Sequence, residues 1–395
     1  MSAGKTPRGA GNTVPHPPLS LQSPSTLALS LLFAATGVGS ALLGSALPAF
    51  LAHWSLSDRG GGLLFFMAWL GAALGALLSR GNLAHSVVRG AAVTALACGF
   101  LIPSGRVAVF PLMFCYGLGL GIIMTSISRL RSQTEHSRRT QELNRLNLLW
   151  ALGALACPTL AAHALFTASI TYLFAIAGCA FAVLGVWAFF TETRMPPVTF
   201  VQATGGKSVP AVLCLISGLI VGVEASLGGW LTTYTKRTDH SITGAVTATS
   251  AFWAGLLLSR AFNSTPWSLR ADGTRALQLY SALVAVSLCL LAIAHRPGAL
   301  LALAFGLGFG LGPLYPLLLA LVLPRFRGNR IFFFAGFGSA LLPWFTGVLS
   351  TGAGSLRAGL AVPCAAGCLL LGLVWWTFGR DAQAWTPVEG TSLNR

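Results

Sequence analysis

Twelve long apolar stretches constrain the fold of this chain more than any other feature. Each has about 20 residues, the length that an α-helix needs to cross the hydrocarbon core of a bilayer. Each is also about twice as long as a strand of a membrane barrel and lacks that strand's alternation, so we expect helices. The approximate ranges are 25–53, 60–80, 86–103, 107–130, 144–166, 169–191, 209–234, 242–261, 276–295, 298–323, 331–351 and 356–379.

The composition agrees with a chain that faces lipid over most of its area. Of the 395 residues, 54% are hydrophobic and only 9% are charged, whereas a soluble domain carries about 25% charged residues. The net charge is +16, but the basic residues form short clusters between the apolar stretches and no continuous face. We therefore interpret the charge as an orientation signal and expect no nucleic-acid partner.

Lysine and arginine are distributed unequally between the two sides of the predicted membrane. With both termini in the cytoplasm, the inner segments hold 19 of these residues and the outer segments hold six. Cytoplasmic loops carry the excess of basic residues, so this distribution favours cytoplasmic termini and an even number of spans. We expect a multi-pass protein of the cell membrane, with the bacterial inner membrane as the favoured location.

The sequence divides into five segments. Residues 1–24, rich in Pro, Ser and Gly, are expected to form a disordered cytoplasmic N-terminus. A polar cytoplasmic linker, 192–208, separates an N-terminal six-helix bundle, 25–191, from a C-terminal six-helix bundle, 209–379. Residues 380–395 are expected to form a cytoplasmic tail.

Two motifs recur in the same order in both halves of the chain. Residues 37–44 in the first span resemble 222–229 in the seventh, and residues 75–80 in the second span resemble 255–260 in the eighth. Chance similarity between Gly- and Leu-rich helices is the alternative for either match alone. A parallel repeat is what a transporter needs when two bundles tilt about a central site. The predicted fold class is an all-α polytopic membrane protein with twelve transmembrane helices in two pseudo-symmetric six-helix bundles.

The cysteines and the catalytic residue types give no sign of metal or enzyme chemistry. All eight cysteines fall inside apolar stretches, with no CxxC pair and no Cys/His cluster at zinc spacing. We interpret them as small core or lipid-facing residues. The spans contain no nucleophile–base pair and no paired carboxylates, so neither an enzyme nor a cofactor is expected.

Glu224 is the one acid that lies deep inside a predicted span, whereas the other acids lie in loops, linkers, tails or span ends. A carboxylate near the bilayer centre costs at least roughly 2.5–3.5 kcal/mol, which favours its protonated form. We predict that Glu224 couples transport to H⁺ or Na⁺. Hydrogen bonding to hydroxyl groups of a solute is a second possibility, and a protonated glutamate that ties two helices together is a purely structural one.

Aromatic and amide side chains supply the candidates for solute binding. Trp230 follows Glu224 on the seventh span, and an aromatic ring beside hydrogen-bonding groups is typical of sugar sites; its alternative is the interfacial aromatic belt. Asn147 is a candidate for binding the solute or for gating. Further candidates for solute contact are Trp150, Trp253, Tyr315 and Trp344. The candidates for gating are Arg80, Asn144 and Arg260.

Loose motifs are spread in order along most of the chain. They are Gly222-x-Glu224-x-x-x-Gly228-Gly229-Trp230-Leu231-x-x-Tyr234, Phe252-Trp253-x-Gly255 to Arg260, Gly310-x-Gly312-Pro313-x-Tyr315-Pro316, Pro343-Trp344-x-x-Gly347, and Leu146-Asn147 with Gly153 and Pro158. This ordered set resembles the major facilitator superfamily, and more closely its fucose-permease-like branch of sugar symporters. The resemblance implies twelve helices, alternating access, and often a hexose carried with H⁺ or Na⁺.

The chain departs from that family at charged positions. Ser79 stands where the family usually carries an acid before Arg80, and spans one and four contain no acid. The usual ion pair at that gate is therefore not expected, and any coupling must depend on Glu224. Fucose as the substrate is not implied.

The sequence thus favours a monomeric secondary active transporter that moves a small polar solute, a hexose-type sugar, by alternating access. Its expected partners are the solute, H⁺ or Na⁺, and membrane lipid. An exporter of drugs or metabolites with the same fold is the main alternative, and a membrane scaffold or sensor is a third possibility.

Overall fold

The structure is a computed structural model that describes residues 24–79, 81–131, 136–167, 169–192, 208–239, 241–263, 273–323, 325–326 and 330–379. For residues 24–26, 136–144, 166–167, 192 and 239 it describes the backbone alone. The predicted segments 1–24, 192–208 and 380–395 therefore lie almost entirely outside the described residues, and Arg80 does so as well.

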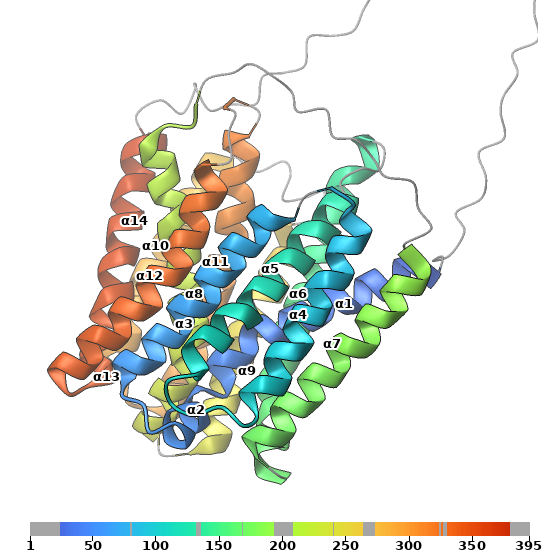
Figure 1. Cartoon of the computed structure of the whole chain (residues 1–395). Coiled ribbons are helices and arrows are strands. Elements are labelled where there is room, and N and C mark those ends of the chain that lie inside the picture. The colour runs from blue at the N-terminus through green and yellow to red at the C-terminus, as the bar shows by residue number, and fades with distance from the viewer. Residues whose placement is uncertain are drawn as a thin grey trace, which may run out of the picture.

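Helices account for nearly all of the described chain (Figure 1). The first half comprises α1 (Pro24–Ser45), α2 (Leu47–His53), α3 (Asp58–Leu78), α4 (Leu83–Leu101), α5 (Val109–Arg131), α6 (His136–Thr167) and α7 (Ile170–Glu192). The second half comprises α8 (Ala211–Asp239), α9 (Ile242–Asn263), α10 (Gly273–Ile293), α11 (Pro297–Val322), α12 (Arg330–Ala353), α13 (Leu356–Gly359) and α14 (Ala361–Gly379).

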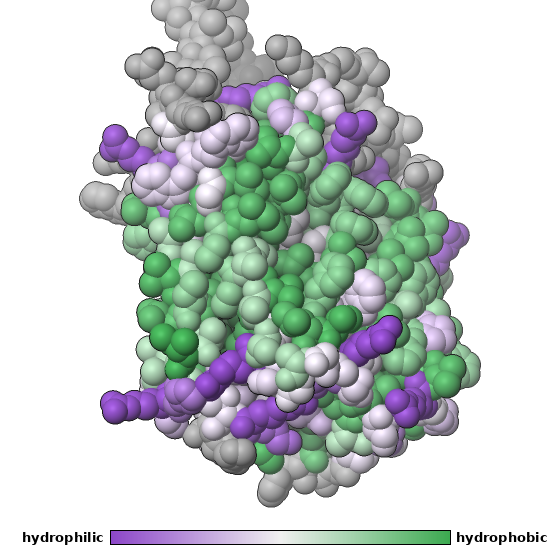
Figure 2. Space-filling model, turned by 90° about the vertical axis from the view of Figure 1, so that its left-hand side faces the viewer, coloured by the Kyte–Doolittle hydropathy of each residue, from purple (hydrophilic) through white to green (hydrophobic). Residues whose placement is uncertain are grey.

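The described residues contain twelve segments that are long and apolar enough to cross a membrane, with α13 and α14 together forming the last. On the face shown in Figure 2, a broad hydrophobic band crosses the middle of the molecule, and hydrophilic side chains gather at both ends of it. An apolar surface of this kind is suited to contact with lipid, and each helix forms its backbone hydrogen bonds internally. The protein is therefore a multi-pass membrane protein, and the predicted fold class is confirmed.

One end of the bundle is here called the terminal face, because α1 begins and α14 ends there. The short helices α2 and α13 lie at the other end, which is called the opposite face (Figure 1). The first predicted span, 25–53, is not one helix, since α1 ends at Ser45 and α2 begins at Leu47. Pro48 lies in the first turn of α2, where a proline's fixed φ favours the start of a helix and its missing N–H leaves no hydrogen bond unmade.

The two halves repeat the same pattern of helix contacts. In the first half α3 packs on α5, α4 on α5 and α7, and α1 on α6. In the second half α9 packs on α11, α10 on α11 and α14, and α8 on α12. These are the same pairs when the spans of each half are counted from one to six, so the pseudo-symmetry seen in the motifs extends to the packing.

Glycines allow the closest of these approaches. A Cβ on Gly75 of α3 would collide with the carbonyl oxygen of Leu118 on α5, and a Cβ on Gly255 of α9 would collide with that of Phe305 on α11. Gly75 and Gly255 occupy the same place in the repeated motif. Small residues let membrane helices pack backbone to backbone, so the motif fixes the spacing of the central helices in each half.

Candidate functional site

The two halves meet mainly along four helix pairs: α3 with α12, α6 with α9, α1 with α8, and α2 with α8. The closest approach is between α1 and α8, where a Cβ on Gly44 would collide with the carbonyl oxygen of Gly228. Glu224 lies one turn before Gly228 on α8. It therefore lies beside the interface between the halves, near the middle of the bundle.

Glu224 is paired with Arg260 of α9. One terminal nitrogen of the guanidinium lies 3.5 Å from each carboxylate oxygen. The two side chains are only 12% and 14% exposed. A charge in such a place needs a partner, and each of these residues supplies the counter-charge of the other. The structure thus joins the predicted coupling residue to one of the predicted gating residues.

Arg260 is held in place from two further directions. Its Nε donates a hydrogen bond of 3.2 Å to the carbonyl oxygen of Gly312 on α11. Its guanidinium carbon lies 5.6 Å from the ring centroid of Trp150 on α6, a cation–π distance. Trp150 belongs to the first half, so Arg260 extends from an acid of its own half to an aromatic ring of the other.

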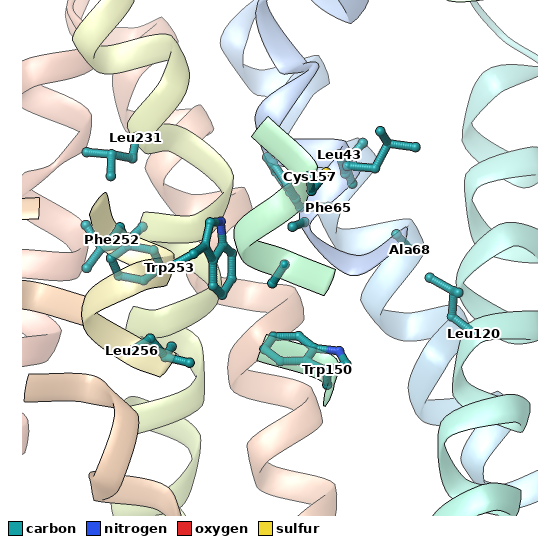
Figure 3. Close-up of a cluster of buried hydrophobic side chains, with 14 of the residues drawn as sticks. Leu43, Phe65, Ala68, Leu120, Trp150, Cys157, Leu231, Phe252, Trp253 and Leu256 are labelled. Carbon is teal, nitrogen blue, oxygen red and sulfur yellow. The ribbon is translucent and has the colours of Figure 1, made fainter. Parts of the chain in front are cut away.

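Trp150 and Trp253 form the aromatic part of the site. Their rings pack edge to face with centroids 5.7 Å apart, and Phe252 packs on Trp253 at 4.9 Å. In Figure 3 the two tryptophans lie between Phe252 and Leu256 on one side and Leu43, Ala68 and Leu120 on the other. Both indole N–H groups are buried and have no hydrogen-bond partner among the described residues. Because the two side chains are 9% and 4% exposed, these donors would reach a ligand only in a more open conformation.

Three further candidates, Tyr315, Asn147 and Asn144, lie on α11 and α6, two helices that contribute to this site. Tyr315 of α11 is partly buried and follows, by three residues, Gly312, whose carbonyl oxygen accepts a hydrogen bond from Arg260. Asn147 lies exposed on α6, one turn before Trp150. Asn144 is on the same helix, but its side chain is outside the described part of the chain.

Trp230 and Trp344 lie elsewhere. Trp230 is fully buried, packs on Phe65 with ring centroids 5.9 Å apart, and donates a 2.9 Å hydrogen bond to the carbonyl oxygen of Pro343. Trp344 packs on Phe66 at 5.5 Å. Both tryptophans thus fill the contact between α3 and α12 towards the opposite face, and Trp230 offers no surface to a solute in this conformation.

A second ion pair closes the opposite face, and the sequence analysis did not single it out. Both terminal nitrogens of Arg237 on α8 donate 2.7 Å hydrogen bonds to the carboxylate of Asp58 on α3. Ser350 of α12 donates to the same carboxylate at 2.5 Å, and the backbone N–H of Arg59 donates to the Thr351 hydroxyl at 2.7 Å. This set of four bonds, the opposite-face contact, joins the first half to the second.

The sequence did contain a signal for this contact. The topology that places both termini on one side puts an acid at the start of the second span and a Lys-Arg pair at the end of the seventh on the same side. The pairing itself needed the packing of α3 against α12 and the end of α8.

Comparison with known proteins identifies the fold. No protein-family model matches the sequence. A solved bacterial homologue of the human lysosomal transporter Spinster, in an inward-facing and occupied conformation, superposes with a TM-score of 0.67 and 15% identity over 89% of this chain and 95% of that one. The chain has the fold of major-facilitator-type transporters.

A local match points to one group of curated relatives. The enterobactin exporters EntS of Salmonella typhi and Salmonella typhimurium are 36% identical to this chain over 107 residues. The match spans about a quarter of the chain and of each relative (26% of both). These similar proteins are membrane transporters and not enzymes, in agreement with the prediction from the sequence. The fucose-permease-like branch, the cation coupling, the monomeric state and the cytoplasmic termini stay predictions.

Proposed function

We propose that this protein is a secondary active transporter that exports an amphipathic solute by alternating access, with Glu224 as the coupling carboxylate. The observation that carries the proposal is the position of Arg260, which pairs with Glu224 in the second half and lies over the Trp150 ring of the first. A change in the charge of Glu224 therefore changes the electrostatic environment of Arg260 at the interface between the halves.

The distribution of contacts between the halves supports alternating access. Gly44 meets Gly228 near the middle of the bundle, Phe65 meets Trp230 nearer the opposite face, and the Asp58–Arg237 pair closes that face. Rocking of the two bundles would break these contacts in order, beginning with the Asp58–Arg237 pair at the opposite face and ending with Gly44 and Gly228. It would thereby open a path towards Glu224.

The Glu224–Arg260 pair supplies a means of coupling. With Glu224 ionised, the pair has no net charge. When the carboxylate takes up a proton, Arg260 loses its counter-charge and a net positive charge remains beside Trp150. The two protonation states therefore present different electrostatic environments to a solute. If the solute binds best when Glu224 is ionised, and its release allows Glu224 to take up a proton, the protein exchanges protons for solute.

An amphipathic solute fits the surroundings better than a hexose. The site combines the rings of Trp150 and Trp253 with two unpartnered N–H donors, which suits a flat apolar body that carries hydrogen-bond acceptors. Trp230, expected from the sequence to stack on a sugar, is fully buried and bonded to Pro343. The local similarity to an exporter supports outward movement rather than hexose uptake.

Transport in inside-out vesicles tests this proposal. Tetraphenylphosphonium, enterobactin, glucose and fucose are offered to vesicles with an acidic interior, and proton release is followed with a pH-sensitive dye. We expect release with at least one of the first two and with neither sugar. Accumulation of a sugar alone would overturn export of an amphipathic solute.

Variants of the acid separate coupling from transport. Glu224→Gln should abolish proton release while exchange of labelled for unlabelled solute continues, and Glu224→Asp should restore part of the release because it keeps an ionisable group. Proton-driven transport at the normal rate in Glu224→Gln would show that the coupling group lies elsewhere.

A further inference from the structure

A pocket of about 300 Å³ opens at the opposite face between α2 and α8. It is lined by Pro48 and Leu51 of the first half and by Thr233, Lys236 and Arg237 of the second. Thr233 follows Glu224 by nine residues, or about 14 Å along the helix. The pocket is therefore separate from the site described above, and like the opposite-face contact it involves both halves.

The charges that line this pocket are all positive. The guanidinium of Arg237 is already paired through two 2.7 Å bonds with Asp58. Lys236 is exposed and has no ion pair among the described residues. One uncompensated ammonium thus stands at the edge of a pocket whose other wall, Pro48 and Leu51, is apolar.

Thr233 is an exception among the threonines of its helix. The hydroxyls of Thr235 and Thr238 donate to the carbonyl oxygens four residues before them, at 2.7 and 2.9 Å, and Thr232 bonds to Thr249 of α9 at 2.8 Å. The hydroxyl of Thr233 is buried and has no partner in the described structure. Buried hydroxyls are rarely left unpaired, so this donor is free for a ligand in the pocket.

The basic residues alone have a simpler explanation. Lysine and arginine are favoured in the last turn of a helix because they complement its dipole, and Lys236 and Arg237 lie in the last turn of α8. That explanation accounts neither for the pocket nor for the unpaired hydroxyl of Thr233. It also implies that an anion bound there depends on the basic side chains, since the helix end itself repels it.

We propose that this pocket binds an anionic amphipath, with its charged head group on Lys236 and Thr233 and its apolar chain against Pro48 and Leu51. The ligand lies between α2 and α8 next to the Asp58–Arg237 pair, so its binding holds the opposite face closed. The shared chemistry of the ligand is an anionic group on a hydrocarbon chain, as in a free carboxylate or an anionic lipid.

Calorimetric titration of the full chain in a neutral detergent tests this site. Octanoate is the probe, 1-octanol supplies the same chain without the charge, and inorganic phosphate supplies an anion without the chain. We expect octanoate to bind and the other two not to bind over the same range. Lys236→Gln and Thr233→Val should each weaken octanoate about tenfold, in line with loss of a charge-assisted hydrogen bond.

Matched controls make the outcome decisive. Arg296→Gln removes an exposed cation at the same face but outside the pocket, and it should leave octanoate binding unchanged. Equal binding of octanoate and octanol, or equal affinities in Lys236→Gln and Arg296→Gln, would overturn the proposal. The titration measures binding at this pocket and not transport, so its result does not depend on the result of the export assay.

The source of the anion is distinguished in nanodiscs. If phosphatidylglycerol in place of part of the phosphatidylcholine weakens octanoate binding, the natural occupant is an anionic lipid. If octanoate binds equally in both membranes, the occupant is a free carboxylate. Loss of octanoate binding in phosphatidylcholine nanodiscs themselves would show that detergent created the site, and would overturn the proposal.

Discussion

The two acid–base pairs among the described residues differ in what they join. Asp58 and Arg237 make two 2.7 Å bonds between the halves, and the Arg237 side chain is 46% exposed. Glu224 and Arg260 lie 3.5 Å apart within the second half, and both are largely buried. The Asp58 side chain, at 10% exposed, is as buried as that of Glu224, so the pairs differ in the exposure of the arginine. The Asp58–Arg237 pair, called the surface pair below, has the shorter contacts.

This difference assigns the pairs to different tasks. When two bundles rock about a central site, contacts between them must break and contacts within each bundle persist. The Asp58–Arg237 pair therefore helps to set which face is closed. The Glu224–Arg260 pair lies within the second half and can persist through the movement. The protonation state of Glu224 can therefore stay the same while the two halves change their relative position.

Loss of Arg260 should have the largest effect. Arg260→Met leaves the Glu224 carboxylate without its counter-charge, and breaking a buried pair in this way costs about 3–5 kcal/mol. The double variant Arg260→Met/Glu224→Gln should recover much of that loss, because no unpaired charge remains. Chemical denaturation in detergent measures both, and equal stability of the single and double variants would contradict a buried pair.

Glycines next to each pair should separate their effects. A Cβ on Gly347 would collide with the backbone of Asp58, and a Cβ on Gly312 would collide with Ser259, next to Arg260. Overpacking of this kind costs about 1–3 kcal/mol. Gly347→Ala should separate the halves at the opposite face, whereas Gly312→Ala should impair transport without separating them.

Distances between spin labels at positions 106 and 296, one in each half at the opposite face, measure this separation. Gly352→Ala is the matched control, because a Cβ there meets nothing within 4 Å. A longer label distance in Gly312→Ala than in Gly347→Ala would reverse the assignment of the two pairs.

Neutralising the surface pair should have a smaller effect. Asp58→Asn removes the charge that faces an exposed arginine, a change worth less than about 1 kcal/mol after solvent screening. The population with an open opposite face should rise about two- to fivefold in the same label measurement. Arg237→Lys keeps the charge but loses the second bond to the carboxylate, so its open population should lie between those of the wild type and Asp58→Asn. A wild-type distance distribution in Asp58→Asn would show that the pair does not hold the face closed.

The smallest effect is expected from the ring beneath Arg260. Trp150→Phe keeps an aromatic face with a weaker attraction for the guanidinium, a loss of about 0.5 kcal/mol, or a two- to threefold change in solute affinity. Trp150→Leu should cost more, because it removes the ring. If Trp150→Phe instead alters the label distance at the opposite face, the two pairs are not independent.

The span pattern was predictable because it follows from local properties. A chain in lipid must satisfy its backbone hydrogen bonds internally, so every apolar stretch of sufficient length becomes a helix. The break at Ala46, between α1 and α2, lies beside Pro48, and a hydropathy pattern does not register it. The repeated Gly75 and Gly255 were visible as a motif, but only the structure shows that each meets the backbone of a helix two spans away.

The site was predictable in part. The sequence by itself determined that the chain inserts in the membrane and that Glu224 is costly there, because the cost of burying a charge depends on the residue and its depth. Only the tertiary structure decided that Arg260, 36 residues away, is its partner, and that Trp230 fills the interface near the opposite face. Those outcomes depend on how closely α8, α9, α11 and α12 pack, and that packing is a property of the whole set of helices rather than of any one of them.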